Sequence, residues 1–106
     1  MEPSKAVRLT PAALSDLEDI WRFTFETWGL SQAENYVAEL NARFEWLSGS
    51  PGTGRQFREG NDSPRIYAHR SHIIAYRHGS DGVEIIRVLH SRRDWERLVE
   101  RSESAE

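Results

Sequence analysis

Two amphipathic helical patterns that follow each other almost without a gap constrain this fold more than any other feature of the sequence. In the first, apolar side chains recur at steps of three or four residues from Leu14 to Trp28, which predicts a helix with one apolar stripe. Thr10 and Pro11 are typical of its N-terminal cap and first turn, and Gly29 of its C-terminal end. A second helix begins within two or three residues, so the two must form an antiparallel hairpin.

The second helical pattern is the more regular of the two. Ser31 and Glu34 have the spacing of a capping box at its start, and the Gly- and Ser-rich segment 48–54 ends it. We assign the apolar residues of both helices to the core and give them no functional role. These predicted core residues are Leu14, Leu17, Trp21, Val37, Leu40 and Phe44.

The other apolar segments are short and rich in residues that favour strands. The stretch 55–64 between the helices and the last strands is polar and is predicted to be a loop. Strands are predicted at residues 5–10, 65–69, 72–77 and 83–89.

Two junctions in this second half are tight enough for hairpin turns, at 70–71 and at 79–82. A short helix is predicted at 94–101, followed by a frayed tail at 102–106. The order is β-α-α-β-β-β in a single domain over residues 1–101. We therefore predict an α+β fold in which an N-terminal helix hairpin packs on one face of a mostly antiparallel sheet, with a short C-terminal helix.

Length and composition limit the class of protein. A chain of 106 residues is one domain, and the absence of cysteine excludes a disulfide scaffold and a Cys-ligated metal site. No apolar run approaches the length needed to cross a bilayer. The first ten residues lack the apolar stretch of a signal peptide, so a cytoplasmic location is expected.

Charge is distributed unevenly along the chain. The net charge is −3, yet residues 55–93 carry eight basic side chains, all arginine, against four acidic ones. The planar guanidinium suits phosphate and carboxylate partners. Arginine is also a common solvated strand residue whose stem covers apolar surface. The Arg-only segment therefore favours an anionic partner only weakly.

Both faces of the last strands are substantially apolar. In residues 83–90 the two alternating sets each contain several aliphatic side chains, and 72–76 shows the same ambiguity. One helix hairpin can cover only one face of a sheet. The second face is covered either by the C-terminal segment or by a partner chain, and this pattern favours a partner.

The sequence gives little support to several kinds of chemistry. It has no Gly-rich phosphate loop, no nucleophile elbow and no helical His spacing for a metal, and His69 and His72 have opposite strand parity. What remains is a cluster of Arg, His and Tyr between 65 and 93. This cluster is compatible with RNA cleavage, in which a His acts as general base and Arg stabilises the charge of the phosphorane. It is equally compatible with binding to a protein or nucleic-acid surface. A lone His90 also fits a hydrogen-bonded histidine at a sheet edge.

Several segments resemble ParE toxins of the RelE/ParE superfamily, in the same order along the chain. They span residues 7–99, and together they are specific to the family although each alone is weak. The segments are 9–13 (LTPAA), 16–21 (DLEDIW), 28–29 with 32–36 (WG and QAENY), 65–77 and 85–94 (IIRVLHSRRD).

The resemblance implies the toxin of a type II toxin–antitoxin system. Its partner would be a ParD-like antitoxin, a DNA-binding dimer with a C-terminal arm that wraps the toxin, so DNA is reached only indirectly. ParE-like toxins are held to poison DNA gyrase, whereas RelE-like relatives cut mRNA in the ribosomal A site. The family implies a hetero-oligomer with the antitoxin. From the residues themselves we expect no metal and no membrane segment, and we expect no cofactor.

The ending of the chain is closer to ParE than to RelE. RelE-type nucleases place several Lys and Arg on the sheet with a terminal Tyr or His, whereas here no Lys follows residue 5 and no Tyr follows Tyr76. Strand parity puts Arg87 and His90 on opposite faces, and a bulge near Leu89 would be needed to bring them together. A gyrase inhibitor is therefore favoured, with a ribosome-dependent endoribonuclease as the alternative and a structural domain without a target as the third.

Site residues follow from these hypotheses. Exposed aromatic residues of the first helix and exposed positions of the sheet are expected to contact the antitoxin, and arginines with one histidine to contact the target. The predicted antitoxin contacts are Phe23, Phe25, Trp28, Tyr76, Ile86 and Val88. The predicted target contacts are Arg65, Arg70, Arg87, His90, Arg92 and Arg93. A nuclease would use His90 as base with Arg87 and Arg93 on the phosphate.

Overall fold

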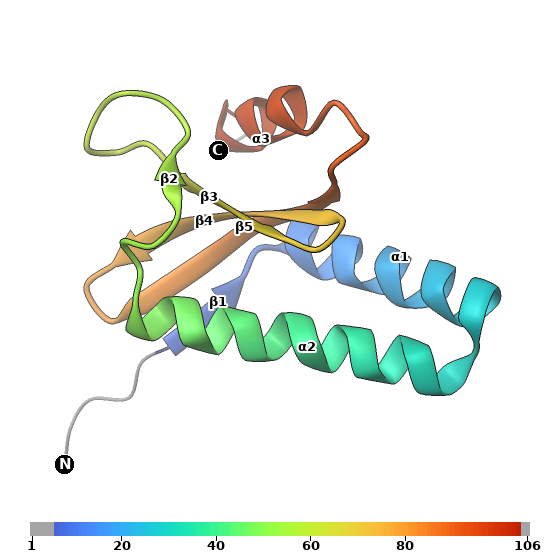
Figure 1. The fold of residues 1–106 in the computed structure, drawn as a ribbon. Helices are drawn as coiled ribbons and strands as arrows, with labels where there is room; N and C mark the ends of the chain where they lie inside the picture. The colour runs from blue at the N-terminus through green and yellow to red at the C-terminus, as the bar shows by residue number, and fades with distance from the viewer. Residues whose placement is uncertain (1–5, 105–106) are drawn as a thin grey trace, which may run out of the picture.

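A computed structural model describes residues 6–104 as three layers (Figure 1). The five-stranded sheet lies between the hairpin of the two long helices on one face and a short C-terminal helix on the other (Figure 1). None of the helices in this range is long and apolar enough to cross a membrane. The elements are β1 (Ala6–Leu9), α1 (Pro11–Trp28), α2 (Leu30–Gly49), β2 (Arg55–Gln56), β3 (Arg65–His69), β4 (His72–Gly79), β5 (Gly82–His90) and α3 (Trp95–Ser104).

The sheet confirms the predicted α+β fold. Its strand order is β1-β5-β4-β3-β2, with β1 parallel to β5 and every other pair antiparallel. The short β2 lies in the segment that was predicted to be loop. Gly82 opens β5 where β1 passes closely, since a Cβ at this position would lie 1.9 Å from the carbonyl oxygen of Ala6.

A bulge in β5 sets which side chains share a face. Tyr76 pairs with Ile85 while Ala75 pairs with Arg87, so Ile86 is the extra residue. From Arg87 onward the register is unbroken to His90. The bulge therefore lies before Arg87 and not near Leu89, and the side chains of Arg87 and His90 leave the strand on opposite faces.

The helix hairpin forms as predicted, with one correction at its joint. The Thr10 hydroxyl accepts a hydrogen bond from the Ala13 amide at 3.0 Å and caps α1. Gly29, at φ 99°, ends α1 and is also the N-cap of α2, which has no side-chain cap. The capping box predicted at Ser31 and Glu34 is wrong, because the helix already begins at Leu30.

The predicted apolar face of α2 is confirmed, whereas that of α1 is rotated by about one residue. Leu40 and Phe44 are buried as expected, but Leu14 is 51% exposed. The buried side chains of α1 are Ala13, Asp16, Ile20 and Thr24, while the predicted core residue Leu17 is partly buried against the same core. A carboxylate thus occupies a place that the sequence pattern gave to an aliphatic side chain.

Two apolar cores lie on the two faces of the sheet. Between the sheet and the hairpin, Tyr76 and Val88 are buried together with Leu40, Phe44 and other side chains. On the other face, α3 packs against Ile66, Ile73, Ala75, Ile86 and Leu89. The C-terminal helix, and not a partner chain, therefore covers the second face of the sheet.

The C-terminal helix is longer than predicted. It continues to Ser104, so the expectation of a frayed tail from residue 102 is wrong as far as residue 104. Residues 105–106 lie outside the described part of the chain.

The burial of Tyr76 generates a testable prediction. Its hydroxyl accepts from the Gly54 amide at 2.9 Å and donates to the Pro51 carbonyl at 2.7 Å, and the residue is fully buried. Tyr76→Phe leaves both groups without a partner, so the free energy of unfolding should fall by about 1–3 kcal/mol. Urea denaturation measures this, with Tyr67→Phe, on the half-buried Tyr67 of β3, as the matched control. Equal stability of the two variants would contradict the assignment.

Candidate functional site

The buried carboxylate of Asp16 is the most heavily engaged polar group near the predicted site. Its Oδ2 accepts from Arg87 Nε at 2.8 Å, and its Oδ1 accepts from Arg87 Nη2 at 2.8 Å. Oδ2 also accepts from the Val88 amide at 2.9 Å. The side chains of Asp16 and Arg87 are 7% and 16% exposed, and the hydrogen bond with Asp16 raises the pKa of Arg87.

This arrangement follows from the short length of β1. The strand ends at Leu9, opposite Ile85, and beyond that point the backbone of β5 has no strand beside it. The Thr10 amide and hydroxyl donate to the carbonyls of Ile85 and Ile86 at 3.0 and 2.8 Å. Further along the same edge, the Asp16 carboxylate accepts from the Val88 amide. The first turns of α1 therefore replace a strand along the edge of β5.

Arg87 also connects the two helical layers. Its Nη1 donates to the Ser102 hydroxyl of α3 at 3.3 Å, while its other two nitrogens, Nε and Nη2, donate to Asp16 of α1. The sequence predicted Arg87 as a target contact and as part of a nuclease site. In the structure its guanidinium is engaged inside the protein, and its role toward a target or a phosphate stays a prediction.

The other arginines predicted to contact the target differ in whether they already bind a group within the chain. Arg65 donates to the Gly54 carbonyl at 2.5 Å, and Arg70 makes a two-point contact with Glu39 at 2.8 and 3.0 Å. Hydrogen bonds from Arg70 and then His69 lower the pKa of Glu39. Arg92 and Arg93 are exposed in the turn after β5.

Three histidines form a row across adjacent strands. His69 pairs with His72 across the two-residue turn, and His72 pairs with His90. The strand-parity argument that separated His69 from His72 is therefore wrong, because residues on either side of such a turn face the same way. Among the described residues, no group of three or more His, Cys, Asp or Glu side chains is placed to hold a metal ion.

The central histidine of this row is held neutral. Its Nδ1 lies 2.7 Å from the Tyr36 hydroxyl, and its ring meets that of His90 edge-on with 5.3 Å between centroids. Burial, then the nearby His90 and His69, lower the pKa of His72 to about 4. Burial also raises the pKa of Tyr36.

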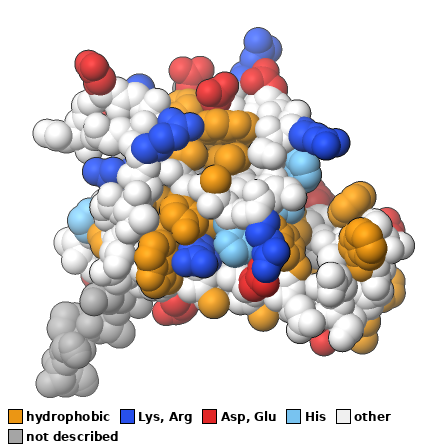
Figure 2. Space-filling model, in the orientation of Figure 1, with side chains coloured by type: hydrophobic (Ala, Val, Ile, Leu, Met, Phe, Trp, Pro, Cys, Tyr) orange, Lys and Arg blue, Asp and Glu red, His pale blue; other side chains and the backbone are white. Residues whose placement is uncertain are grey.

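A cavity of about 420 Å³ lies beside this row, between the hairpin and the ends of β4 and β5. Phe23 and Trp28, which are 66% and 69% exposed, lie at it. Figure 2 shows hydrophobic side chains gathered at this end of the hairpin, at the right. The polar residues that line the cavity include Tyr36, His72, His90 and Arg93.

The structure separates the predicted partner contacts into two groups. Phe23, Phe25 and Trp28 are exposed as expected, with Phe25 stacked on Trp21. Tyr76 and Val88 are buried beneath the hairpin, and Ile86 is buried beneath α3. These three side chains are therefore buried within the chain and not exposed on its surface, because both faces of the sheet are covered.

Comparison with known proteins identifies the family. The family model described as "ParE toxin of type II toxin-antitoxin system, parDE" matches residues 7–95. Toxin ParE1 of Caulobacter vibrioides is 42% identical over 86 residues, which cover 81% of this chain and 88% of that protein. Toxin ParE1 of Mycobacterium tuberculosis is 38% identical over 90 residues, which cover 84% of this chain and 92% of that protein.

A solved structure shares the fold. It is described as the chromosomal ParDE TA system from P. aeruginosa, and it aligns with a TM-score of 0.67 at 19% identity. The alignment covers 81% of this chain and 95% of that chain. The helix hairpin and the sheet are therefore an architecture that other proteins also adopt.

The pairing of Asp16 with Arg87 predicts a large effect of substitution. Asp16→Asn removes the negative charge and leaves Arg87 buried without compensation, so the free energy of unfolding should fall by about 3 kcal/mol. Asp19→Asn is the matched control, since Asp19 pairs with Arg22 on the surface and should change stability by less than about 0.5 kcal/mol. Urea titration compares the two variants, and equal losses would contradict the assigned role.

The depressed pKa of His72 predicts a pH dependence of stability. Because the folded-state pKa is about 4 and the ordinary value is 6.5, the unfolded chain binds more protons between these values. The free energy of unfolding should therefore fall as the pH is lowered from 6.5 to 4, and this loss should shrink in His72→Gln. Urea denaturation at several pH values measures it. The same pH profile in both proteins would show that His72 titrates normally in the folded state.

Proposed function

This chain belongs to the ParE toxins of type II toxin–antitoxin systems, and from that membership we propose that it inhibits DNA gyrase and is neutralised by a ParD-like antitoxin. The proposal includes action in the cytoplasm, where gyrase works on DNA. The chain itself reaches DNA only through the antitoxin. The observation that carries the choice of target is the position of Arg87.

Arg87 argues against the nuclease alternative. Cleavage of RNA by this fold would need a base beside cations that stabilise the charge of the phosphorane. His90 and Arg93 line one cavity, but Arg87 leaves β5 on the opposite face and binds Asp16. With its charge already compensated, Arg87 is poorly suited to bind phosphate. Recognition of a protein surface requires no such assembled group of catalytic side chains.

The exposed end of the hairpin supports an antitoxin contact. Phe23 and Trp28 are two large aromatic side chains beside a mostly apolar cavity, and such residues are typical anchors of protein interfaces. Arg93 at the same cavity would favour an acidic residue in the partner. We therefore assign Phe23, Phe25 and Trp28 to the antitoxin surface of a hetero-oligomer.

The target surface that we propose contains fewer residues than the six predicted from the sequence. Arg92 and Arg93 are exposed and His90 is half-buried next to them in the chain. Arg65 and Arg70 already have partners within the chain. We propose that gyrase contacts centre on His90, Arg92 and Arg93.

A parallel assay tests the proposal. Purified toxin, released from its antitoxin, is added to gyrase in a supercoiling assay and to ribosomes that translate a reporter mRNA. Supercoiling should be lost while the mRNA stays intact, and added antitoxin should restore supercoiling. His90→Ala should weaken inhibition by less than about fivefold, since single contacts rarely dominate a protein interface.

Two variants make the assay discriminating. Trp28→Ala should need more antitoxin for neutralisation, whereas Trp46→Ala, which alters an exposed tryptophan of α2, should behave like the unaltered toxin. Cleaved mRNA with normal supercoiling, abolished by His90→Ala, would overturn the proposal in favour of a nuclease.

A further inference from the structure

The cavity beside the histidine row has the size of a small-molecule site. The joint of α1 and α2 projects beyond the ends of β4 and β5 (Figure 1), so the inner side of the hairpin has no strand beneath it there. The cavity of about 420 Å³ at this place falls within the range of about 300–1,000 Å³ that small-molecule sites occupy. It therefore has room for a ligand of one or two rings.

Five rings line this cavity. They belong to Phe23 and Trp28 of α1, Tyr36 of α2, His72 of β4 and His90 of β5. The ring centroid of His72 lies 5.4 Å from that of Tyr36 and 5.3 Å from that of His90, so three of the rings form a continuous wall. Aromatic rings pack well against other planar ring systems. The wall therefore favours a planar ligand over an aliphatic one.

Most polar groups around the cavity already have partners. The two carboxylate oxygens of Asp16 accept from Arg87, and the Thr24 hydroxyl donates to a backbone carbonyl of its own helix at 2.7 Å. The Tyr36 hydroxyl and His72 Nδ1 lie 2.7 Å apart. These groups need no hydrogen bond from a ligand, so the apolar part of a ligand can lie against them.

His90 and Arg93 supply donors at the β5 end of the cavity. His90 Nδ1 accepts from the Arg92 amide at 3.1 Å, so the neutral ring carries its proton on Nε2, which is then a donor. The Arg93 amide donates to the His90 carbonyl at 3.0 Å, and this turn brings both side chains to the same cavity. An imidazole N–H and a guanidinium both require an acceptor, and an anion satisfies them best.

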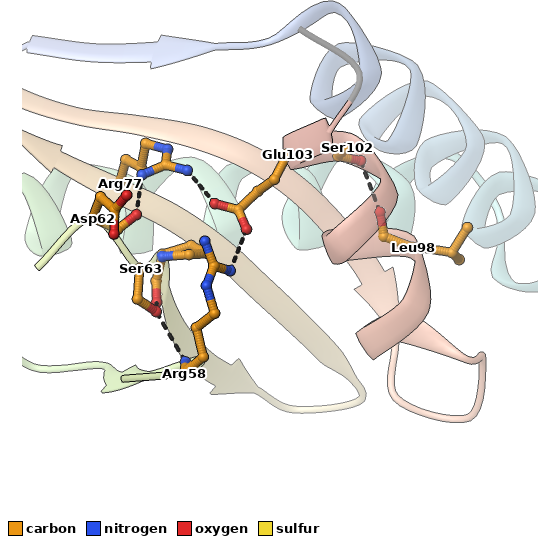
Figure 3. Close-up of polar contacts among 8 residues, drawn as sticks. Arg58, Asp62, Ser63, Arg77, Leu98, Ser102 and Glu103 are labelled. Carbon is orange, nitrogen blue, oxygen red and sulfur yellow. Dashed lines mark hydrogen bonds and ion pairs between the residues drawn. The ribbon is translucent and has the colours of Figure 1, made fainter. Parts of the chain in front are cut away.

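Arg93 differs from several other arginines because it has no carboxylate partner. Figure 3 shows Arg58 and Arg77 on the shared carboxylate of Glu103, and a carboxylate of α2 binds Arg70. Within residues 6–104, the side chain of Arg93 forms no ion pair. Its charge is therefore available to an anion in the cavity.

One carboxylate at the cavity favours the opposite ligand charge. Asp19 of α1 is also a lining residue, but its side chain is 68% exposed and pairs with Arg22 at 3.2 Å. A compensated and solvated carboxylate attracts a cation only weakly. The unpaired Arg93 should therefore decide which ligand charge the cavity prefers.

We propose that this cavity binds a small planar aromatic acid, with its ring system among the five rings and its carboxylate on Arg93 and His90. Such a ligand would lie between Phe23 and Trp28, which we assign to the antitoxin, and the two cationic residues that we assign to the target. The ligand site itself depends on neither assignment, because it follows from the rings and the unpaired donors alone.

Three indole compounds with different side-chain charges test the proposal by calorimetric titration of the full chain, in about 0.15 M salt. Indole-3-acetate should bind with a Kd on the order of 0.1 mM, as expected for a ligand of this size. Indole-3-acetamide should bind about fivefold more weakly, since it lacks the charge-assisted hydrogen bond, and the cation tryptamine more weakly still. Tryptamine binding as tight as that of indole-3-acetate would overturn the proposal, as would the absence of saturable binding of indole-3-acetate at millimolar concentration.

A pair of arginine variants tests the position of the carboxylate. Arg93→Gln should weaken the binding of indole-3-acetate about fivefold and leave that of indole-3-acetamide unchanged. Arg92→Gln is the matched control, because Arg92 is the exposed neighbour and does not line the cavity, and it should change either affinity by less than about twofold. Equal losses in both variants would show a general attraction of anions and would overturn the assigned site.

A pair of phenylalanine variants tests the position of the rings. Phe23→Ala should weaken the binding of indole-3-acetate and indole-3-acetamide alike, by about fivefold. Phe25→Ala, on the same helix but stacked on Trp21 outside the cavity, should leave both affinities unchanged. In ¹⁵N NMR spectra of the unaltered chain, indole-3-acetate should shift the amides of residues 88–93 and of Thr24. Shifts confined to α3 would place the ligand elsewhere and overturn the proposal.

Discussion

The structure depends on the way in which Asp16 completes the edge of β5. Because β1 stops at Leu9, β5 extends beyond its neighbour, and its free backbone groups need other partners. Asp16 accepts one hydrogen bond from that backbone and two from Arg87, which in turn donates to Ser102 of α3. One carboxylate therefore fixes the helix hairpin against the sheet and connects it to the helix on the opposite face.

Local patterns predicted those elements whose partners are close in sequence. The apolar face of α2, the cap at Thr10 and the turn at 70–71 all follow from spacings of a few residues, and the structure has each of them. The burial of Asp16 depends on Arg87, which is 71 positions away. No periodicity in α1 indicates such a partner. The inward face of the helix was therefore predicted about one residue away from its actual position, and Asp16 was placed on the outer surface.

The candidate site shows the same limit. Phe23 lies off the predicted apolar stripe and is exposed, and Trp28, at the end of that stripe, is exposed as well. Tyr76 and Val88 were expected at the surface and are buried. Their burial depends on how the hairpin and α3 pack over both faces of the sheet. The row of His69, His72 and His90 was missed, although the two-residue turn at 70–71 already implies that its first two members face the same way.

The central claim is that Asp16 holds Arg87 inside the free toxin, so that this cation is not part of the target surface. The exchange rate of the Arg87 Nε–H proton, measured by ¹⁵N NMR on the full chain, tests it most directly. We predict slow exchange for Arg87 beside rapid exchange for the exposed Arg92 and Arg93, since Nε donates to a buried carboxylate. Exchange of Arg87 as fast as that of Arg92 would contradict the account and return Arg87 to the candidate site.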